Sequence, residues 1–168
     1  WEEPVLSGTR GAGCIFFSGC NLGCVFCQNG KISHDNFGKV ISSGRLRAVM
    51  EELIAQGAHC IDLVSPTQFT PWILEALEKP PGVPVVWNSG GYERVETLRA
   101  LEGKVDIYLP DLKYVTADLA GKYSAAPDYP EAAKRAVLEM YRQRGPCLLY
   151  SSDAADEEER VGRGGGSN

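Results

Sequence analysis

Three cysteines lie close together in the sequence, at a spacing suited to binding a metal or a cluster. Cys20, Cys24 and Cys27 are separated by three and by two residues. Structural zinc sites and ordinary ferredoxin clusters each use four protein ligands. Three thiolates on a four-iron cluster would leave one iron open to a chelating cosubstrate. A zinc site would instead need a fourth ligand, for which His34 is the candidate.

The cysteine loop is rich in glycine, and the remaining cysteines lie elsewhere. Gly19, Gly23 and Gly30 would let backbone amides approach the cysteine sulfurs. Hydrogen bonds and exposure help to set cluster potentials, which reach about −700 mV. Three further cysteines occupy apolar runs and are predicted to be small buried residues, although the first is close to the loop in sequence: Cys14, Cys60 and Cys147.

The loop, with Phe26 before its third cysteine, resembles the signature of the radical S-adenosylmethionine (SAM) superfamily. Six stretches in order resemble the poorly characterised subgroup related to pyruvate formate-lyase activating enzyme. They are Pro4–Arg10, Ser18–Leu22, Cys27–Asn29, Val64–Phe69, Asn88–Glu93 and Tyr108–Tyr114. The resemblance extends from Trp1 to about Gly145, and several ordered motifs are more specific than any single one.

This resemblance implies an enzyme, an oxidoreductase of the radical SAM type. Cys20, Cys24 and Cys27 would bind a 4Fe-4S cluster, and SAM would chelate the open iron. Reductive cleavage of S-adenosyl-L-methionine would give a 5′-deoxyadenosyl radical that abstracts hydrogen from a substrate. In activating enzymes that substrate is a glycyl-radical enzyme, and the electron donor is flavodoxin or ferredoxin. No protein side chain is assigned as a catalytic residue.

Two polar residues follow the second predicted strand, where many radical SAM enzymes have a Gly-Gly-Glu turn. Thr67 and Gln68 occupy that place and could accept a hydrogen bond from the methionyl amine of SAM. The alternative for Thr67 is a turn that precedes the next helix. Phe26 would pack beside the adenine by resemblance, or else be an ordinary core residue.

Ligands of parallel α/β folds bind at the carboxyl ends of the strands, where the remaining candidates lie. Asn88, Ser89 and Gly90 follow the third predicted strand, and the glycine would let a ligand approach the backbone. Asp111 and Lys113 follow the fourth. By resemblance, Asn88, Ser89 and Asp111 would supply oxygen ligands to a monovalent cation and Lys113 would contact SAM. The alternative is that Asp111 and Lys113 pair with each other or with solvent. Tyr92 and Glu93 are interpreted as helix-start residues.

The elements that must position these residues alternate between strands and helices. Strands are predicted at 13–17, 60–65, 83–87 and 105–109, with a strand stub at 147–150. Helices are predicted from Ser43 as cap to Gly57, from Thr70 as cap to 78, and over 93–101, 116–122 and 130–144. This alternation indicates a parallel α/β fold, either an open sheet or an arc of a barrel. The resemblance favours a partial (β/α) barrel truncated to about four strands, forming one domain over residues 1–150.

Composition excludes some classes of partner. The 168 residues are 43% hydrophobic, with a net charge of −5 and no basic run, so no nucleic acid is expected. No apolar run is long enough for a membrane span, and no start resembling a signal peptide is present, so a cytoplasmic location is expected. Residues 151–168, acidic and then glycine-rich, are predicted to be a disordered tail or an artefact. The start at Trp1 suggests a fragment, and a non-catalytic fragment of a radical SAM protein is therefore an alternative.

Overall fold

The computed structural model describes residues 4–145, which form an α/β fold built on one sheet of four parallel strands. The strands are β1 (Gly13–Phe16), β2 (Ile61–Val64), β3 (Val85–Ser89) and β4 (Ile107–Pro110). Their order in the sheet is β1-β2-β3-β4, the order of the sequence. The predicted parallel α/β fold with four strands is confirmed, with strand boundaries that differ by up to two residues.

Helices connect the strands. The longer ones are α3 (Ser43–Ala55), α4 (Thr70–Ala76), α5 (Val95–Ala100), α6 (Ala117–Ser124) and α7 (Tyr129–Arg144). Three short helical segments were not predicted: α1 (Pro4–Ser7), α2 (Gly30–Ser33) and the 3₁₀ turn η1 (Thr67–Phe69). Such segments of one turn carry too few residues to show a helical period in the sequence.

The caps of two helices, α3 and α4, differ from the prediction. The cap of α3 is Ser42 rather than Ser43, because the Ser42 side chain accepts a hydrogen bond from the amide of Arg45. The Thr70 hydroxyl does not cap α4. It donates to the carbonyl of Thr67 at 2.7 Å and so closes η1 against the helix. Gly57 follows α3 with a φ of +99°, as a helix terminator should.

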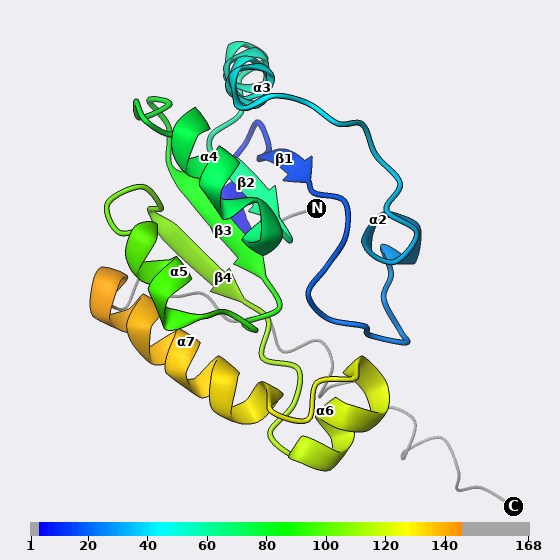
Figure 1. The fold of residues 1–168 in the computed structure, drawn as a ribbon. Coiled ribbons are helices and arrows are strands. Elements are labelled where there is room, and N and C mark those ends of the chain that lie inside the picture. Colours follow the sequence, from blue (N-terminus) through cyan, green and yellow to red (C-terminus); the bar gives the residue numbers. More distant parts are fainter. Residues whose placement is uncertain (1–3, 146–168) are drawn as a thin grey trace, which may run out of the picture.

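The main hydrophobic core lies between one face of the sheet and the helices α3, α4, α5 and α7 (Figure 1). Alternate residues of β2 and β3, such as Ile61, Leu63 and Trp87, are fully buried against these helices. On the opposite face, Leu6 of α1 packs with Val86 and Leu109. The long connecting helices therefore share one side of the sheet.

This arrangement fits an arc of a barrel better than a doubly wound sheet. A doubly wound sheet reverses its strand order and carries helices on both faces. Here the strand order follows the sequence and the long connecting helices cover one face. Closure into a partial barrel stays a prediction, since the strand stub expected at 147–150 and the tail at 151–168 lie outside the described residues.

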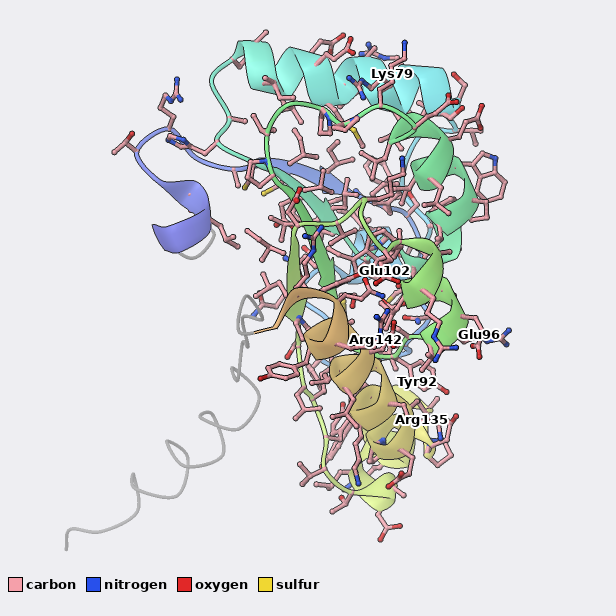
Figure 2. The ribbon with its side chains drawn as sticks, turned by 90° about the vertical axis from the view of Figure 1, so that its left-hand side faces the viewer. Lys79, Tyr92, Glu96, Glu102, Arg135 and Arg142 are labelled. Carbon is pink, nitrogen blue, oxygen red and sulfur yellow. The ribbon has the colours of Figure 1, made fainter. Side chains whose placement is uncertain are left out.

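Charged pairs hold α7 against its neighbours. Arg142 of α7 donates to Glu102, just after α5, at 3.0 Å and to Glu139 at 2.7 Å. Figure 2 shows Arg142 and Glu102 side by side, with Tyr92 next to the N-terminal half of α7. These contacts fix the position of α7, which reaches from the core to the carboxyl ends of the strands. Within residues 4–145, no helix is long and apolar enough to span a membrane.

Candidate functional site

The loop that carries the three cysteines leaves β1 and runs past the side of the sheet where the strands end (Figure 1). Cys24 is buried, and Cys20 and Cys27 are half-buried. All three are free thiols that pack against one group of side chains, here called the carboxyl-end cluster. Its other buried members are Leu22, Tyr114, Ala120, Ala126, Tyr129 and Ala133. The three cysteines of the sequence motif therefore pack against the same apolar side chains, those of the carboxyl-end cluster.

Backbone hydrogen bonds attach the cysteine loop to the end of α6. The amide of Gly23 donates to the carbonyl of Ser124 at 3.1 Å, and the amide of Val25 donates to Tyr123 at 2.9 Å. Asn21 donates from its side chain to the carbonyl of Tyr92. The loop is therefore held by residues that lie 71 or more positions further along the chain.

Gln68 attaches the start of the same loop to the turn after β2. Its amide nitrogen lies 2.9 Å from the carbonyl of Gly19, 3.2 Å from that of Ser18 and 3.1 Å from that of Ser65. Because that nitrogen donates to the protein, the carbonyl oxygen of Gln68 is the part of the side chain suited to accept a ligand amine. Gln68 is exposed, so such a ligand could reach it.

Thr67 contacts a buried acid that the sequence analysis interpreted as a helix-start residue. Its hydroxyl donates to Oε1 of Glu93 at 2.7 Å, and the indole of Trp87 donates to the same oxygen at 3.3 Å. Glu93 is 4% exposed, and its Oε2 has no hydrogen-bond partner within standard geometry among the described residues. Since α5 begins only at Val95, Glu93 is not part of the helix. It links the ends of β2 and β3.

Burial raises the pKa of Glu93, and hydrogen bonds from Thr67, Ser89 and Trp87 only partly oppose this. Between the ordinary glutamate pKa and the raised folded-state value, the folded chain binds more protons than the unfolded chain. The free energy of unfolding should therefore fall as pH rises through this window, by at most about 1.4 kcal/mol per pH unit.

Glu93→Gln should abolish that pH dependence and make the protein more stable than the wild type above the window. Urea unfolding between pH 4.5 and 8 measures the effect. Glu96→Gln is the matched control, because Glu96 lies on α5 and points into solvent (Figure 2). An E93Q curve parallel to that of the wild type would contradict a raised pKa for Glu93.

Asn88 and Ser89 are neighbours on β3 and point to opposite faces of the sheet. The Asn88 amide nitrogen donates to Oδ2 of Asp62 at 3.3 Å, on the face opposite the main core. The Ser89 hydroxyl accepts from the amide of Gly91 at 3.3 Å and is buried. The structure therefore does not bring these two oxygens to the same point. Asp62, a fully buried acid of β2, was not identified from the sequence.

Asp111 and Lys113 form an ion pair with each other just beyond β4. Both are partly buried. Burial lowers the pKa of Lys113, but the adjacent Asp111 carboxylate outweighs it, so that pKa is raised and the ammonium stays charged. Burial raises the pKa of the Cys24 thiol, and the charge of Lys113 only partly opposes this rise. The pairing that the sequence analysis left as an alternative is what the structure contains, and it lies beside the cysteine loop.

Tyr129, the first residue of α7, joins the ends of β3 and β4. Its hydroxyl accepts from the amide of Lys113 at 2.9 Å and lies 2.8 Å from the carbonyls of Gly90 and Asp111, which share its single proton. Tyr129 is fully buried, and burial is the main cause of its raised pKa. No sequence motif pointed to this residue, because its partners come together only in the folded chain.

Removing the Tyr129 hydroxyl should destabilise the protein. Tyr129→Phe leaves the Lys113 amide and the strand-end carbonyls without this partner, at an expected cost of about 1–3 kcal/mol. Urea unfolding measures it, with Tyr141→Phe on the exposed side of α7 as the control. Equal stability of the two variants would show that water replaces the hydroxyl without loss.

Gly90 is the position where the strand ends and the cysteine loop touch. A Cβ atom built on Gly90 would lie 2.7 Å from Cδ1 of Leu22 and 3.6 Å from Cε of Lys113. Leu22, between the first two cysteines, is 3% exposed and has little space to move. Phe26 is 48% exposed and meets Tyr114 edge-on, with ring centroids 6.4 Å apart. Phe26 is therefore not a core residue, and its predicted contact with adenine stays a prediction.

The donor chemistry at the loop suits iron, although the site is not preassembled. Burial raises the pKa of Cys24. Its hydrogen bond from Ser124 and the charge of Lys113 oppose this rise, and the nearby Cys20 and Cys27 side chains add to it. Such mutual repulsion of thiolates is relieved when a cation binds between them. Among residues 4–145, no three His, Cys, Asp or Glu side chains already lie in the arrangement of a metal site, so binding a metal would require the thiols to approach one another. His34 is exposed at the end of α2.

Comparison with known proteins gives one distant relative. No protein-family model matches the chain. The chain is 35% identical over 143 residues to the uncharacterized protein MJ0674 of Methanocaldococcus jannaschii. The match covers 80% of this chain and 41% of the archaeal protein, so the chain spans less than half of that relative. The name of the relative states no activity.

Proposed function

We propose that this chain is the cluster-binding part of a radical SAM enzyme resembling glycyl-radical activating enzymes. The observation that carries the proposal is that Cys20, Cys24 and Cys27 all pack against the carboxyl-end cluster. This cluster lies beside the carboxyl ends of a parallel sheet whose strands follow the order of the sequence. Three clustered thiols, with no fourth cysteine in the loop, match a cluster with one open iron better than a closed four-ligand site.

The cysteines would hold the 4Fe-4S cluster, and the strand ends would hold SAM. When bound, the reduced cluster supplies one electron that splits SAM into methionine and a 5′-deoxyadenosyl radical for hydrogen abstraction. Gln68 offers a carbonyl oxygen to the methionyl amine, and Lys113 offers a positive charge to the carboxylate. Thr67, the neighbour of Gln68 in the sequence, is held in place by its hydrogen bond to Glu93.

The remaining candidates have less direct roles. Asn88, oriented by Asp62, and Asp111 are the candidate oxygen ligands for a monovalent cation, whereas Ser89 supports the turn that follows β3. Because Gly90 has no side chain, its backbone can lie close to Leu22 of the cysteine loop. Phe26 offers a half-exposed aromatic ring for the adenine. The partners expected are a flavodoxin or ferredoxin, and a glycyl-radical enzyme as substrate, in a reducing compartment such as the cytoplasm.

Two alternatives have different consequences. The first alternative is a non-catalytic fragment. This chain spans 41% of its archaeal relative, and substrate contacts would come from the remainder of that longer protein, so the chain could bind the cluster without turning over SAM. A structural zinc site would need His34, an exposed residue that directly follows α2, as its fourth ligand. Because the loop holds three cysteines and no second pair, the zinc site is the weaker alternative.

Product analysis tests the proposal. The chain, and separately the longer archaeal relative, are reconstituted with iron and sulfide under argon and incubated with dithionite and SAM. Equal amounts of 5′-deoxyadenosine and methionine are expected from an active protein. Product from the relative but not from this chain would support the fragment alternative. A cluster-loaded relative that leaves SAM intact would overturn the proposed reaction.

A further inference from the structure

A chain of two hydroxyl groups ends on the sulfur of Cys24. The Ser124 hydroxyl lies 2.8 Å from Sγ of Cys24 and the Tyr114 hydroxyl lies 2.8 Å from Oγ of Ser124. Ser124 is 1% exposed and Tyr114 is 8% exposed, so water competes little for these groups. A serine hydroxyl has a single proton. When Ser124 donates that proton to the sulfur, it must accept from Tyr114.

The surroundings fix this orientation. Ser124 is the last residue of α6, and its carbonyl accepts from the amide of Gly23 in the cysteine loop. The ring of Tyr114 packs edge-on against Tyr129, with centroids 5.6 Å apart. Both hydroxyls are therefore held by buried packing, and the donor that faces Cys24 is preorganised.

A hydrogen bond to a cysteine sulfur favours the more electron-rich state of a cluster that the sulfur binds. Reduction adds one negative charge, part of which resides on the sulfur ligands, and a donor at the sulfur stabilises that charge. Hydrogen bonds to the sulfurs are one of the factors that set cluster potentials. A second donor behind the first polarises it and strengthens the effect.

We propose that Ser124, polarised by Tyr114, is a positioning residue that raises the reduction potential of the cluster through the sulfur of Cys24. This inference rests on the proposed function, since it requires a cluster on Cys24. The proposal gives a role to Ser124 at the end of α6 and to Tyr114 between β4 and α6. Without it, these segments only support the cysteine loop.

The test is a potentiometric titration, followed by EPR, of the reconstituted wild type and of Ser124→Ala and Tyr114→Phe. Ser124→Ala should lower the midpoint potential, and Tyr114→Phe should lower it by a smaller amount. Ser42→Ala is the control: it removes the cap of α3, far from the loop, and should cost stability without moving the potential. Thermal unfolding of each variant separates stability from potential.

The outcomes are distinct. A wild type that takes up no iron–sulfur cluster would overturn the proposed function and this inference with it. A loaded wild type and a loaded Ser124→Ala with equal potentials would overturn the inference alone. If Ser124→Ala does not hold the cluster, Tyr114→Phe decides. A midpoint potential below that of the wild type supports the proposed role of the two hydroxyl groups, and an unchanged potential contradicts it.

Discussion

Replacing Cys24 with alanine is expected to abolish iron–sulfur cluster binding, and replacing Cys20 or Cys27 should do the same. Loss of a single second-sphere partner typically costs 10- to 100-fold in metal affinity, so loss of one of three thiolate ligands should cost more than about 100-fold. Iron and sulfide analysis and the visible absorbance of the reconstituted protein measure the loss. Cys24 should have the largest effect on folding as well, because it is the buried member of the three.

The other cysteines provide matched controls. Cys60 is buried beside β2 and donates to the carbonyl of Leu6, and Cys14 of β1 lies 3.8 Å from Oδ2 of Asp62. Cys60→Ser and Cys14→Ser should both load iron as the wild type does. Loss of the cluster in Cys14→Ser would show that a fourth thiolate is needed, and the open iron on which the proposed reaction depends would then be lost.

Gly90→Ala should disturb the cysteine loop although Gly90 is far from it in sequence. The new methyl group would lie 2.7 Å from Cδ1 of Leu22. Overpacking of this kind typically costs about 1–3 kcal/mol of folding free energy. Because Leu22 lies between Cys20 and Cys24, its displacement should also weaken cluster uptake. Urea unfolding and iron content per chain measure the two effects.

A double-mutant cycle identifies the cause. Leu22→Ala creates space for the new methyl group, so the costs of Gly90→Ala and Leu22→Ala should be less than additive. Gly44→Ala is the control, since its Cβ would meet nothing closer than Ser42 Oγ at 3.9 Å and a helix interior favours alanine by roughly 0.5–1 kcal/mol. Additive costs would contradict the contact with Leu22 as the cause of the Gly90→Ala effect.

The sequence predicted the sheet well because each strand carries its own signal. Runs such as Ile61–Val64 and Val85–Ser89 are mainly apolar, flanked by turn residues and separated by helical periods, so local pattern and tertiary structure agree. The helix starts were less accurate. Ser42 and Ser43 are equally good caps by composition, and only the hydrogen bond from the amide of Arg45 decides between them.

The candidate site was predictable only where its residues share a motif. The three cysteines are neighbours in the sequence, whereas Tyr129, Ser124 and Glu93 obtain their roles from partners on other elements. Glu93 resembles an ordinary acid at a helix start, because its burial under the ends of β2 and β3 leaves no local trace. Asp62 is similarly hidden within an apolar strand, where a carboxylate is costly unless the fold supplies donors such as Asn88.

EPR of the reconstituted, dithionite-reduced chain, with and without SAM, tests the central claim most directly. We predict a signal of a reduced 4Fe-4S cluster whose shape and g values change when SAM is added, because SAM would bind the iron that no cysteine holds. Cys24→Ala should give no such signal. A colourless, zinc-loaded protein, or a cluster signal that is identical with and without SAM in both this chain and its longer archaeal relative, would contradict the account.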